Sequence, residues 1–425
     1  MARASNLPVD PARIGDVIDG LAGLTEPGRP YTRRAFTAQF PAGRDFLRDR
    51  FQAAGLETRI DAAGNLVARR PGRKPGLGTI MLGSHSDTVP DGGRYDGIAG
   101  VAVALEVARA LSDQGIELDH DLEVVDFLAE EVSIFGVSCI GSRGMAGVLP
   151  QEWLTRESGG LTLEQGIRDA GGDPARIAAE ARKDIAAFLE LHIEQGPVLE
   201  TEKRDIGVVT AIAGITRIEI VVEGRADHAG TTPMGNRADA LAAAARLVTG
   251  IEALAKSFSE GAGHFTATVG EFSIEPNAAN VVPSRARLLI DARAEERTTM
   301  DVFAASVEQL AEQTARETGT VIAPPRRISD NMPTPGDALL LDVLDAACET
   351  AGASHRRMAS GAGHDTAFMA KVTRAAMIFV PCLGGRSHAP EEFAETDDIA
   401  LGAAVLLSAV IQLDGKLQKV IQEGA

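Results

Sequence analysis

The sequence predicts an α/β protein, in which helices flank the mixed central sheet of a large domain and a smaller α+β domain is inserted into that large domain. Apolar strand-like runs alternate with helix-like segments through the first half of the chain, and the order of elements then changes before helix and strand signals resume. At 425 residues the chain is also longer than one hydrophobic core usually supports. Two domains are therefore expected.

The first half of the chain gives the alternating signal. A helical period from Arg44 ends at Gly55, and two β-like runs, ETRIDA and NLVARR, follow on either side of a turn at Ala63 and Gly64. The runs GTIMLGS and DLEVVDFLAEE are apolar enough for buried strands, and IAGVAVALEVARAL between them has the length and alanine content of a buried helix. This alternation predicts a parallel or mixed sheet.

The middle of the chain has a different order of elements. It reads as β (ITRIEIVVEG), α (ADALAAAARLVTGIEALAKSF), β (FTATVGEFSI), β (RARLLIDARA), α (MDVFAASVEQLAEQTARETG) and β (TVIAPPRRI), which is the ferredoxin-like order. After the turn-rich NMPTPGD, strand and helix signals return and end in a long helix from Asp398. We therefore predict a larger domain of residues 1–212 and 331–425 and an inserted domain of residues 213–330.

Composition excludes several classes of partner. A formal net charge of −18 makes nucleic acid and anionic membrane surfaces poor partners, because both would repel the chain at long range. The first residues lack the apolar region of a signal peptide, and no later stretch is expected to span a bilayer, so we predict a cytoplasmic enzyme. Its three cysteines, Cys139, Cys348 and Cys382, lack metal-type spacing and are expected to be buried free thiols.

Polar residues gather where the predicted strands end, which is where α/β folds bind their ligands. His85 directly follows the apolar IMLG, and Asp87 is well placed to hold its imidazole ring from behind. The glycine-rich loop PDGGRYDG can bring Asp96 back beside His85. Glu130 and Glu131 end another strand, so the segment resembles half of a metal site.

One histidine after a strand is more often a hydrogen-bonded loop residue than a ligand, so recurrence of the pattern matters. LELHIEQGP puts His192 at a third strand end, and GGRSHAPEE puts His388 in a loop after a fourth. Two pairs of histidine and carboxylate with one spare acid indicate a hydrolase.

Six motifs occur in a fixed order along the chain: GSHSDTVPDGGRYDG, AEE, ELHIEQGPVLE, EPNAANVVP, GAGHDT and SHAPEE. On these motifs the chain resembles the M20 family of dinuclear metallohydrolases, and within it the hydantoinase/carbamoylase amidases, over essentially its whole length. These include N-carbamoyl-L-amino acid hydrolases, β-ureidopropionases and allantoate amidohydrolases. M20 aminoacylases and carboxypeptidases generally carry an acid at the position of His192, so this histidine favours the carbamoylase group.

The resemblance implies two divalent metal ions per chain, zinc or manganese. It implies that His85 and His192 bind one ion and that Glu131 and His388 bind the other. Asp96 is then expected to bind both ions. Glu130 is then left free as the general base. Mixed nitrogen and oxygen ligands suit zinc, but manganese and cobalt also bind carboxylate-rich sites, so the sequence leaves the metal open. His364 and Asp365 in GAGHDT are interpreted as structural support for the metal-binding loops.

The resemblance also implies residues that hold the substrate. Asn280 and Arg293 are expected to bind its carboxylate, and Gln195 follows the ligand His192. His228 is expected to act in catalysis by reaching the partner's site from the inserted lid and dimerisation domain, which implies a homodimer. Arg386, before the SH dipeptide, departs from the family pattern and either provides a second anionic contact or faces outward.

The sequence therefore predicts a metal-dependent amidohydrolase that cleaves a linear C–N bond in a small substrate bearing a carboxylate. An N-carbamoyl-L-amino acid or related ureido acid is the favoured substrate, and an M20 amidase releasing an amino acid from an N-acyl or aryl-acyl conjugate or a short peptide is the alternative. A non-catalytic binding protein on the same fold would usually have lost a ligand or the base, and all six positions are intact.

Overall fold

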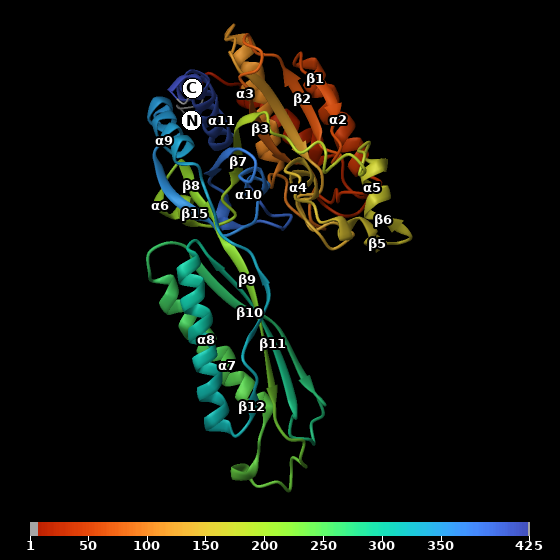
Figure 1. Ribbon diagram of the computed structural model, residues 1–425, viewed down its shortest axis with the longest axis vertical. Coiled ribbons are helices and arrows are strands. Elements are labelled where there is room, and N and C mark those ends of the chain that lie inside the picture. The colour runs from red at the N-terminus through yellow and green to blue at the C-terminus, as the bar shows by residue number, and fades with distance from the viewer. Residues whose placement is uncertain (1–6, 424–425) are drawn as a thin grey trace. The chain divides into compact units, whose positions relative to one another are not determined.

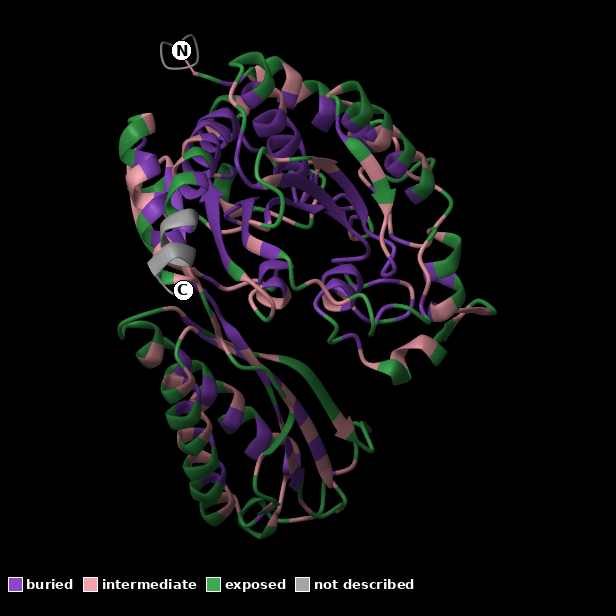
Figure 2. Cartoon of the chain, turned by 45° about the horizontal axis from the view of Figure 1, so that its top comes forward, coloured by how far each residue is buried: buried purple, intermediate pink, exposed green. Residues whose placement is uncertain are grey.

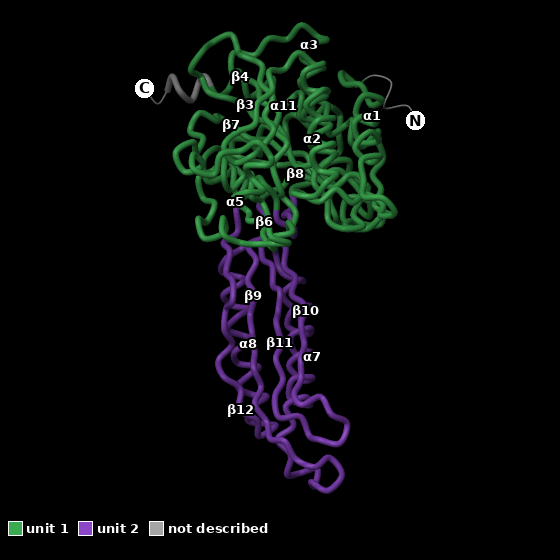
Figure 3. Tube along the Cα trace, turned by 90° about the vertical axis from the view of Figure 1, so that its right-hand side faces the viewer, with its two compact units in different colours: residues 1–210, 336–357, 364–425 green, residues 211–335, 358–363 purple. Residues whose placement is uncertain are grey.

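A computed structural model describes residues 7–423 and the side chains of residues 7–417. Its chain divides into two compact units (Figure 3). Unit 1 comprises Met1–Thr210, Gly336–Arg357 and His364–Ala425, and unit 2 comprises Ala211–Pro335 and Met358–Gly363.

The larger sheet is mixed and has nine strands among the described residues, most of which lie in unit 1 (Figure 1). The strand order is β1-β2-β4-β3-β7-β16-β8-β14, with β15 beside β8. The central strands β4, β3, β7 and β16 pair in parallel, whereas β2 and β8 pair antiparallel with their neighbours. The strands are β1 (Glu57–Ile60), β2 (Leu66–Arg70), β3 (Thr79–His85), β4 (Asp121–Phe127), β7 (Ile185–Ile193), β8 (Ile206–Ile212), β14 (Thr334–Pro335), β15 (His355–Ser360) and β16 (Arg374–Val380), and a separate small hairpin joins β5 (Glu157–Ser158) to β6 (Leu161–Thr162).

Helices flank this sheet, so the predicted fold class of unit 1 is confirmed. The strands at its centre are buried along nearly their whole length, as Figure 2 shows. The main core packs five helices, α1, α2, α3, α9 and α11, together with strand side chains. The helices of unit 1 are α1 (Pro11–Ala22), α2 (Phe40–Ala53), α3 (Ile98–Asp113), α4 (Ile140–Met145), α5 (Leu163–Asp169), α6 (Val198–Glu202), α9 (Ala338–Ala351), α10 (Thr366–Met369) and α11 (Thr396–Glu423).

Helix α11 corrects one expectation. By length and composition its segment Thr396–Leu417 could cross a membrane, whereas no such stretch was expected. Because 72% of its apolar window is buried inside the structure, the segment has the burial of a core helix. All three cysteines are buried and free, as predicted.

Unit 2 has the predicted β-α-β-β-α-β order. Its antiparallel sheet has the order β10-β11-β9-β12, with β13 also beside β9. Its elements are β9 (Gly214–Glu223), α7 (Ala240–Ser259), β10 (Phe265–Glu275), β11 (Arg285–Ala294), α8 (Arg297–Thr318), β12 (Val321–Ile322) and β13 (Arg326–Asp330). The expected last strand is divided, because Pro324 and Pro325 lack the N–H groups that a ladder needs.

Candidate metal centre

The predicted polar residues lie at one edge of the unit 1 sheet. β3 ends at His85, β4 ends shortly before Glu130, and His192 is next to the end of β7. Because β3 pairs in parallel with both β4 and β7, the carboxyl ends of these strands lie side by side. Asp96 and His388 come from the loops after β3 and β16.

Two groups of side chains here could each hold a metal ion, and they share Asp96. The first is His85, Asp96 and His192, and the second is Asp96, Glu131 and His388. Within each group the potential ligand atoms lie within 4.8 Å of one another. The first group is buried, whereas the side chain of His388 is 50% exposed, so the second group is the one open to solvent.

Each oxygen of Asp96 faces a different group. Oδ1 lies 3.1 Å from Nε2 of His192 and 3.6 Å from Nε2 of His85. Oδ2 lies 3.0 Å from Nε2 of His388, which is itself 3.2 Å from Oε1 of Glu131. This arrangement allows one carboxylate to contribute a ligand to both groups.

The imidazole rings of the first group present the correct nitrogen. Nδ1 of His85 lies 3.0 Å from the carbonyl oxygen of Asp87, and Nδ1 of His192 lies 2.9 Å from the carbonyl oxygen of Ile193. A carbonyl can only accept a hydrogen bond, so each Nδ1 carries a proton, and Nε2 is the nitrogen that can bind a cation once it has lost its own proton. Nε2 of each ring lies beside Oδ1 of Asp96, where a cation shared by the three side chains would bind.

The charges of the centre also fit a cation. Among the described residues, every ion pair of Asp96, Glu130 and Glu131 is with a histidine and none is with lysine or arginine. Burial raises the pKa of Glu130 well above its usual range. The charge of His85 lowers this pKa, whereas the negative charge of Glu131 raises it further. Hydrogen bonds to Asp96 and Glu131 raise the pKa of His388 to about 10, which is the response of a site that attracts positive charge.

Asp96 titrates in the opposite sense. Burial disfavours its charge, but hydrogen bonds from His192 and His388 hold the pKa of this carboxyl well below its usual range. The residues present therefore fit two divalent cations: the donors are imidazole nitrogens and carboxylate oxygens, and in the described part of the chain these carboxylates have histidines, but no lysine or arginine, as ion-pair partners.

Glu130 belongs to neither group, although it adjoins the first. Its Oε2 lies 3.7 Å from Nε2 of His85, and its Oε1 accepts a hydrogen bond from the Cys139 thiol at 3.5 Å. The residue is 9% exposed. A buried carboxylate beside a metal site, with a raised pKa, has the properties of a general base.

Asp87 has a different contact from the expected one. Its carbonyl oxygen, rather than its carboxylate, is the hydrogen-bond partner of His85, because the nearer carboxylate oxygen is 3.6 Å from Nδ1. The carboxylate instead accepts the backbone N–H groups of Glu130 at 3.1 Å and Glu131 at 3.2 Å. Asp87 therefore connects the ends of β3 and β4.

The backbone is strained around the centre. Four residues that are not glycine, Ala129, Cys139, Gln195 and His388, have φ between +52° and +56°. This left-handed conformation costs a residue with a side chain about 1–2 kcal/mol, and such strain is concentrated at functional sites. Ala129 immediately precedes Glu130, His388 belongs to the second group, and the side chains of Cys139 and Gln195 contact Glu130 and Asp96.

Gln195 contacts the shared ligand directly. Its Nε2 donates to Oδ2 of Asp96 at 3.0 Å and to Oγ of Ser387 at 3.1 Å. Because the amide nitrogen is used in this way, its carbonyl oxygen faces elsewhere and can accept a hydrogen bond from a ligand. Ser387 and its partner Glu392 were not singled out from the sequence, although both lie in the motif SHAPEE.

Arg33 supports the segment between His85 and Asp87 through hydrogen bonds to backbone carbonyl groups. Arg33 is fully buried and donates to the carbonyl oxygens of Leu21, Leu24 and Ser86. Ser86 lies between His85 and Asp87 in the sequence. Burial lowers the pKa of Arg33 to about 10. Nothing in the sequence around Arg33 predicted this role.

The GAGHDT motif lies against the same centre. The ring of His364 packs edge-on against His192 at 4.7 Å, and Asp365 accepts a hydrogen bond from Ser142. Both motif residues are buried. These contacts agree with the interpretation of this motif as structural support.

The remaining predicted residues are not all gathered here. Arg386 is 57% exposed in its side chain and pairs with the exposed Glu391 at 3.1 Å, so it faces outward in this structure. In unit 2, Asn280 accepts a hydrogen bond from the backbone of Ala229, directly after His228. Arg293 lies near the other end of β11 and pairs with Asp291 at 2.9 Å.

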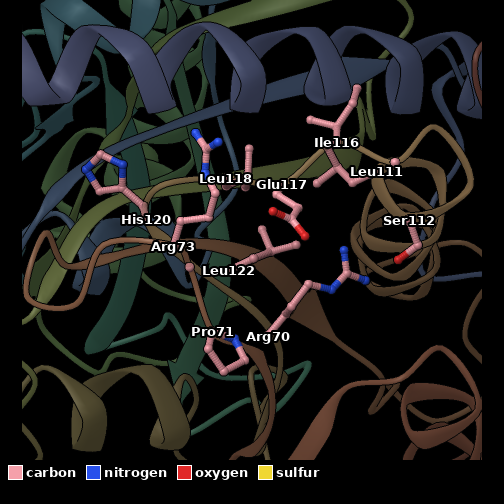
Figure 4. Close-up of a pocket in the computed structure, with 12 residues that line it drawn as sticks. Arg70, Pro71, Arg73, Leu111, Ser112, Ile116, Glu117, Leu118, His120 and Leu122 are labelled. Atoms are coloured by element: carbon pink, nitrogen blue, oxygen red, sulfur yellow. The ribbon is translucent and has the colours of Figure 1, made fainter.

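A cavity of about 540 Å³ elsewhere in unit 1 is not part of this centre (Figure 4). It lies at the start of β4, whereas His85 lies level with the end of that strand. Its two arginines already have partners, since Arg70 donates to the carbonyl oxygen of Ala108 and Arg73 pairs with Asp119. We assign this cavity no role.

A mixed α/β sheet with two histidine–carboxylate groups at its strand ends is typical of metal-dependent hydrolases. The comparison with known families identifies the particular group: residues 81–412 match Peptidase family M20/M25/M40, and the chain belongs to this family. The resemblance inferred from the motifs is therefore confirmed.

The chain is similar to several proteins over nearly its whole length. It is 36% identical to the N-carbamoyl-L-amino-acid amidohydrolase of Paenarthrobacter aurescens, over 95% of this chain and 98% of that protein. It is 36% identical to the allantoate amidohydrolase of Bacillus subtilis, over 94% and 97%. The crystal structure of a hydantoinase/carbamoylase family amidase from Burkholderia multivorans matches with a TM-score of 0.87 and 35% identity, over 95% of this chain and 98% of that one.

Proposed function

We propose that this protein is a metal-dependent amidohydrolase that cleaves a linear C–N bond in a small substrate bearing a carboxylate, an N-carbamoyl-L-amino acid or a related ureido acid. The observation that carries the proposal is the pair of donor groups that share Asp96, with the carboxylate of Glu130 beside them and outside both. Relatives named for action on carbamoyl and ureido compounds support the substrate class. A cytoplasmic location remains a prediction.

In this proposal His85, His192 and Asp96 hold one divalent ion, and Asp96, Glu131 and His388 hold a second. Zinc or manganese would suit these nitrogen and oxygen donors. When bound, such ions polarise a carbonyl group and lower the pKa of water.

Glu130 moves the proton. Its carboxylate accepts a proton from the water that adds to the ureido carbonyl carbon, and returns that proton to the nitrogen that leaves when the C–N bond breaks. Its raised pKa suits both steps, because a carboxylate with a pKa nearer neutrality gains and loses a proton more evenly. The contact with Cys139 and the backbone bonds to Asp87 keep the group oriented.

Three further residues bind the substrate. Gln195 accepts a ureido N–H through its carbonyl oxygen, and Arg293 and Asn280 bind the carboxylate. His228 donates to the oxygen that gains negative charge. Arg386 faces outward and pairs with Glu391, so it is given no contact with the substrate.

Distances within unit 2 support a homodimer. Eight steps along β11 separate Arg285 from Arg293 by about 27 Å at ~3.4 Å per residue. The chain before Arg285 continues in the same direction, with backbone hydrogen bonds from Ser284 to Glu275 and from Ala229 to Asn280. Asn280 therefore lies beyond Arg285, on the side away from Arg293. One small carboxylate can therefore contact both residues only if they come from different chains, with His228 beside Asn280.

A substrate panel tests the function. The protein is reconstituted with zinc or manganese and given N-carbamoyl-L-amino acids, other ureido acids and N-acyl amino acids, and ammonium and new amine are measured separately. Ammonium together with amine is the expected result. Amine without ammonium would instead favour the acyl-amide alternative.

Mixing two inactive variants tests the dimer. Arg293→Ala and Asn280→Ala are combined in equal amounts and allowed to exchange subunits. If one site takes these residues from two chains, each mixed dimer regains one complete site, and activity recovers to about a quarter of the wild-type value. No recovery after demonstrated exchange would contradict the two-chain site.

A further inference from the structure

Two loops that carry ligands are joined by one buried carboxylate. Oε1 of Glu392 accepts the backbone N–H groups of Tyr95 at 2.8 Å and Asp96 at 3.0 Å. Its Oε2 accepts the hydroxyl of Ser387, the residue before His388, at 2.7 Å. Glu392 is 2% exposed, so these three donors are its environment in place of water.

The close approach of the two loops depends on a glycine. A Cβ atom at Gly93 would lie 2.0 Å from the carboxyl carbon of Glu392, a distance that no side chain tolerates. The loop before Asp96 therefore packs directly on this carboxylate, which is separated from it by nearly 300 residues in the sequence.

We propose that Glu392 is a positioning residue that orients Asp96 between the two metal ions and fixes the loop of His388 against it. The inference rests on the metal centre proposed above. Asp96 contributes to both groups only while each of its oxygens faces the correct histidines, and the backbone on which it is mounted is held by Glu392. Residues that orient metal ligands in this way typically change metal affinity about 10–100-fold when replaced.

The negative charge of Glu392 is part of this role. Oγ of Ser387 accepts a hydrogen bond from Gln195 and has a single proton, which it donates to Glu392. In Glu392→Gln the amide oxygen is needed to accept the N–H groups of Tyr95 and Asp96, so the amide nitrogen, a donor, faces Ser387. The hydroxyl of Ser387 then donates instead to its other acceptor, Oδ2 of Asp96, at 3.3 Å. That bond competes with a metal ion for the same oxygen.

The test measures metal binding directly. Metal-free wild type and Glu392→Gln are titrated with Zn²⁺ in competition with a chelating dye, and the cobalt-loaded proteins are compared by visible spectroscopy. We expect the variant to bind its weaker Zn²⁺ about 10–100-fold less tightly and to show a changed cobalt spectrum, while thermal unfolding of the metal-free protein is unchanged. Glu395→Gln, an exposed charge in the same loop, is the matched control and is expected to behave as wild type.

Gly93→Ala supplies an independent perturbation if Glu392→Gln does not fold. Its methyl group displaces Glu392 but leaves the carboxylate in the chain, and the same loss of Zn²⁺ affinity is expected. Two Zn²⁺ ions bound with unchanged affinity and an unchanged cobalt spectrum in either folded variant would overturn the role of Glu392. A wild-type protein that binds fewer than two ions would overturn the metal centre itself, and the inference with it.

Discussion

Replacing Glu130 by glutamine separates the roles of two adjacent acids. The amide has nearly the shape of the carboxylate and can retain the contact with Cys139, but it cannot accept a proton from water. Glu130 lies outside both donor groups, whereas Glu131 lies in the second. The variant should therefore lose turnover and keep its metal ions.

The size of the loss follows from the role. General-base catalysis typically contributes about 10²–10⁴-fold, which corresponds to roughly 3–5 kcal/mol at about 1.4 kcal/mol for each factor of ten. The fold should not suffer, because burial beside Glu131 already disfavours the charge of Glu130 and the amide removes that charge. We expect the metal-free variant to unfold at the wild-type temperature or above it.

The assay compares Glu130→Gln with Glu131→Gln on the best ureido substrate, after equal loading with zinc and direct measurement of bound metal. Glu131→Gln should lose metal together with activity, because it removes a ligand. A Glu130 variant with at least a third of wild-type kcat would refute the base assignment, and one that loses a metal ion would show that this residue is a ligand instead.

Three further changes have defined outcomes. Gly97→Ala would put a Cβ atom 2.3 Å from Nε2 of His85, at a backbone φ of +67°. We therefore expect the amount of zinc retained after dialysis to fall about tenfold. The control Gly235→Ala, whose Cβ would have nothing within 4 Å, should retain zinc fully. Burial raises the pKa of Asp398 from 3.8 to about 6, so the stability gained from its bound proton is present below pH 4 and is lost as pH rises through 6. The variant Asp398→Asn removes the charge that burial disfavours. After allowance for partial exposure, it should stabilise the protein by ~1 kcal/mol at pH 8 and by less at pH 4.5, as measured by urea unfolding. Arg386→Ala should leave KM unchanged for N-carbamoyl amino acids with acidic and with neutral side chains, because Arg386 faces outward and pairs with Glu391, and a KM raised several-fold only for the acidic substrates would show that it contacts the substrate.

The fold and the residues of the centre could be predicted because both depend on local signals. A buried strand is visible as an apolar run, and a histidine or acid directly after it, such as His85, lies at the carboxyl edge of a parallel sheet whatever the remaining contacts are. The division of the last strand in unit 2 was missed, although its signal is local, since Pro324 and Pro325 interrupt the ladder.

The contacts that hold the centre together could not be predicted in the same way. The spacing of His85 and Asp87 predicts that they are close, but not that the carbonyl oxygen binds the imidazole while the carboxylate binds the next strand. Arg33 and Glu392 each contact backbone groups of a segment distant in sequence. Backbone donors and acceptors have no signature in the sequence, so only the folded chain identifies these partners.

The two donor groups consequently differ in what fixes them. His85 and His192 lie on adjacent buried strands of the parallel sheet, and each ring is bonded to a backbone carbonyl at or beside its own strand end. Glu131 and His388 lie on loops, and the half-exposed His388 has a left-handed backbone. The sheet alone can place the two histidines of the first group, whereas every residue of the second group, including the shared Asp96, lies on a loop and requires the contacts of Asp87 and Glu392. The more open group, which a substrate can reach, is thus the one whose geometry depends on contacts between distant loops.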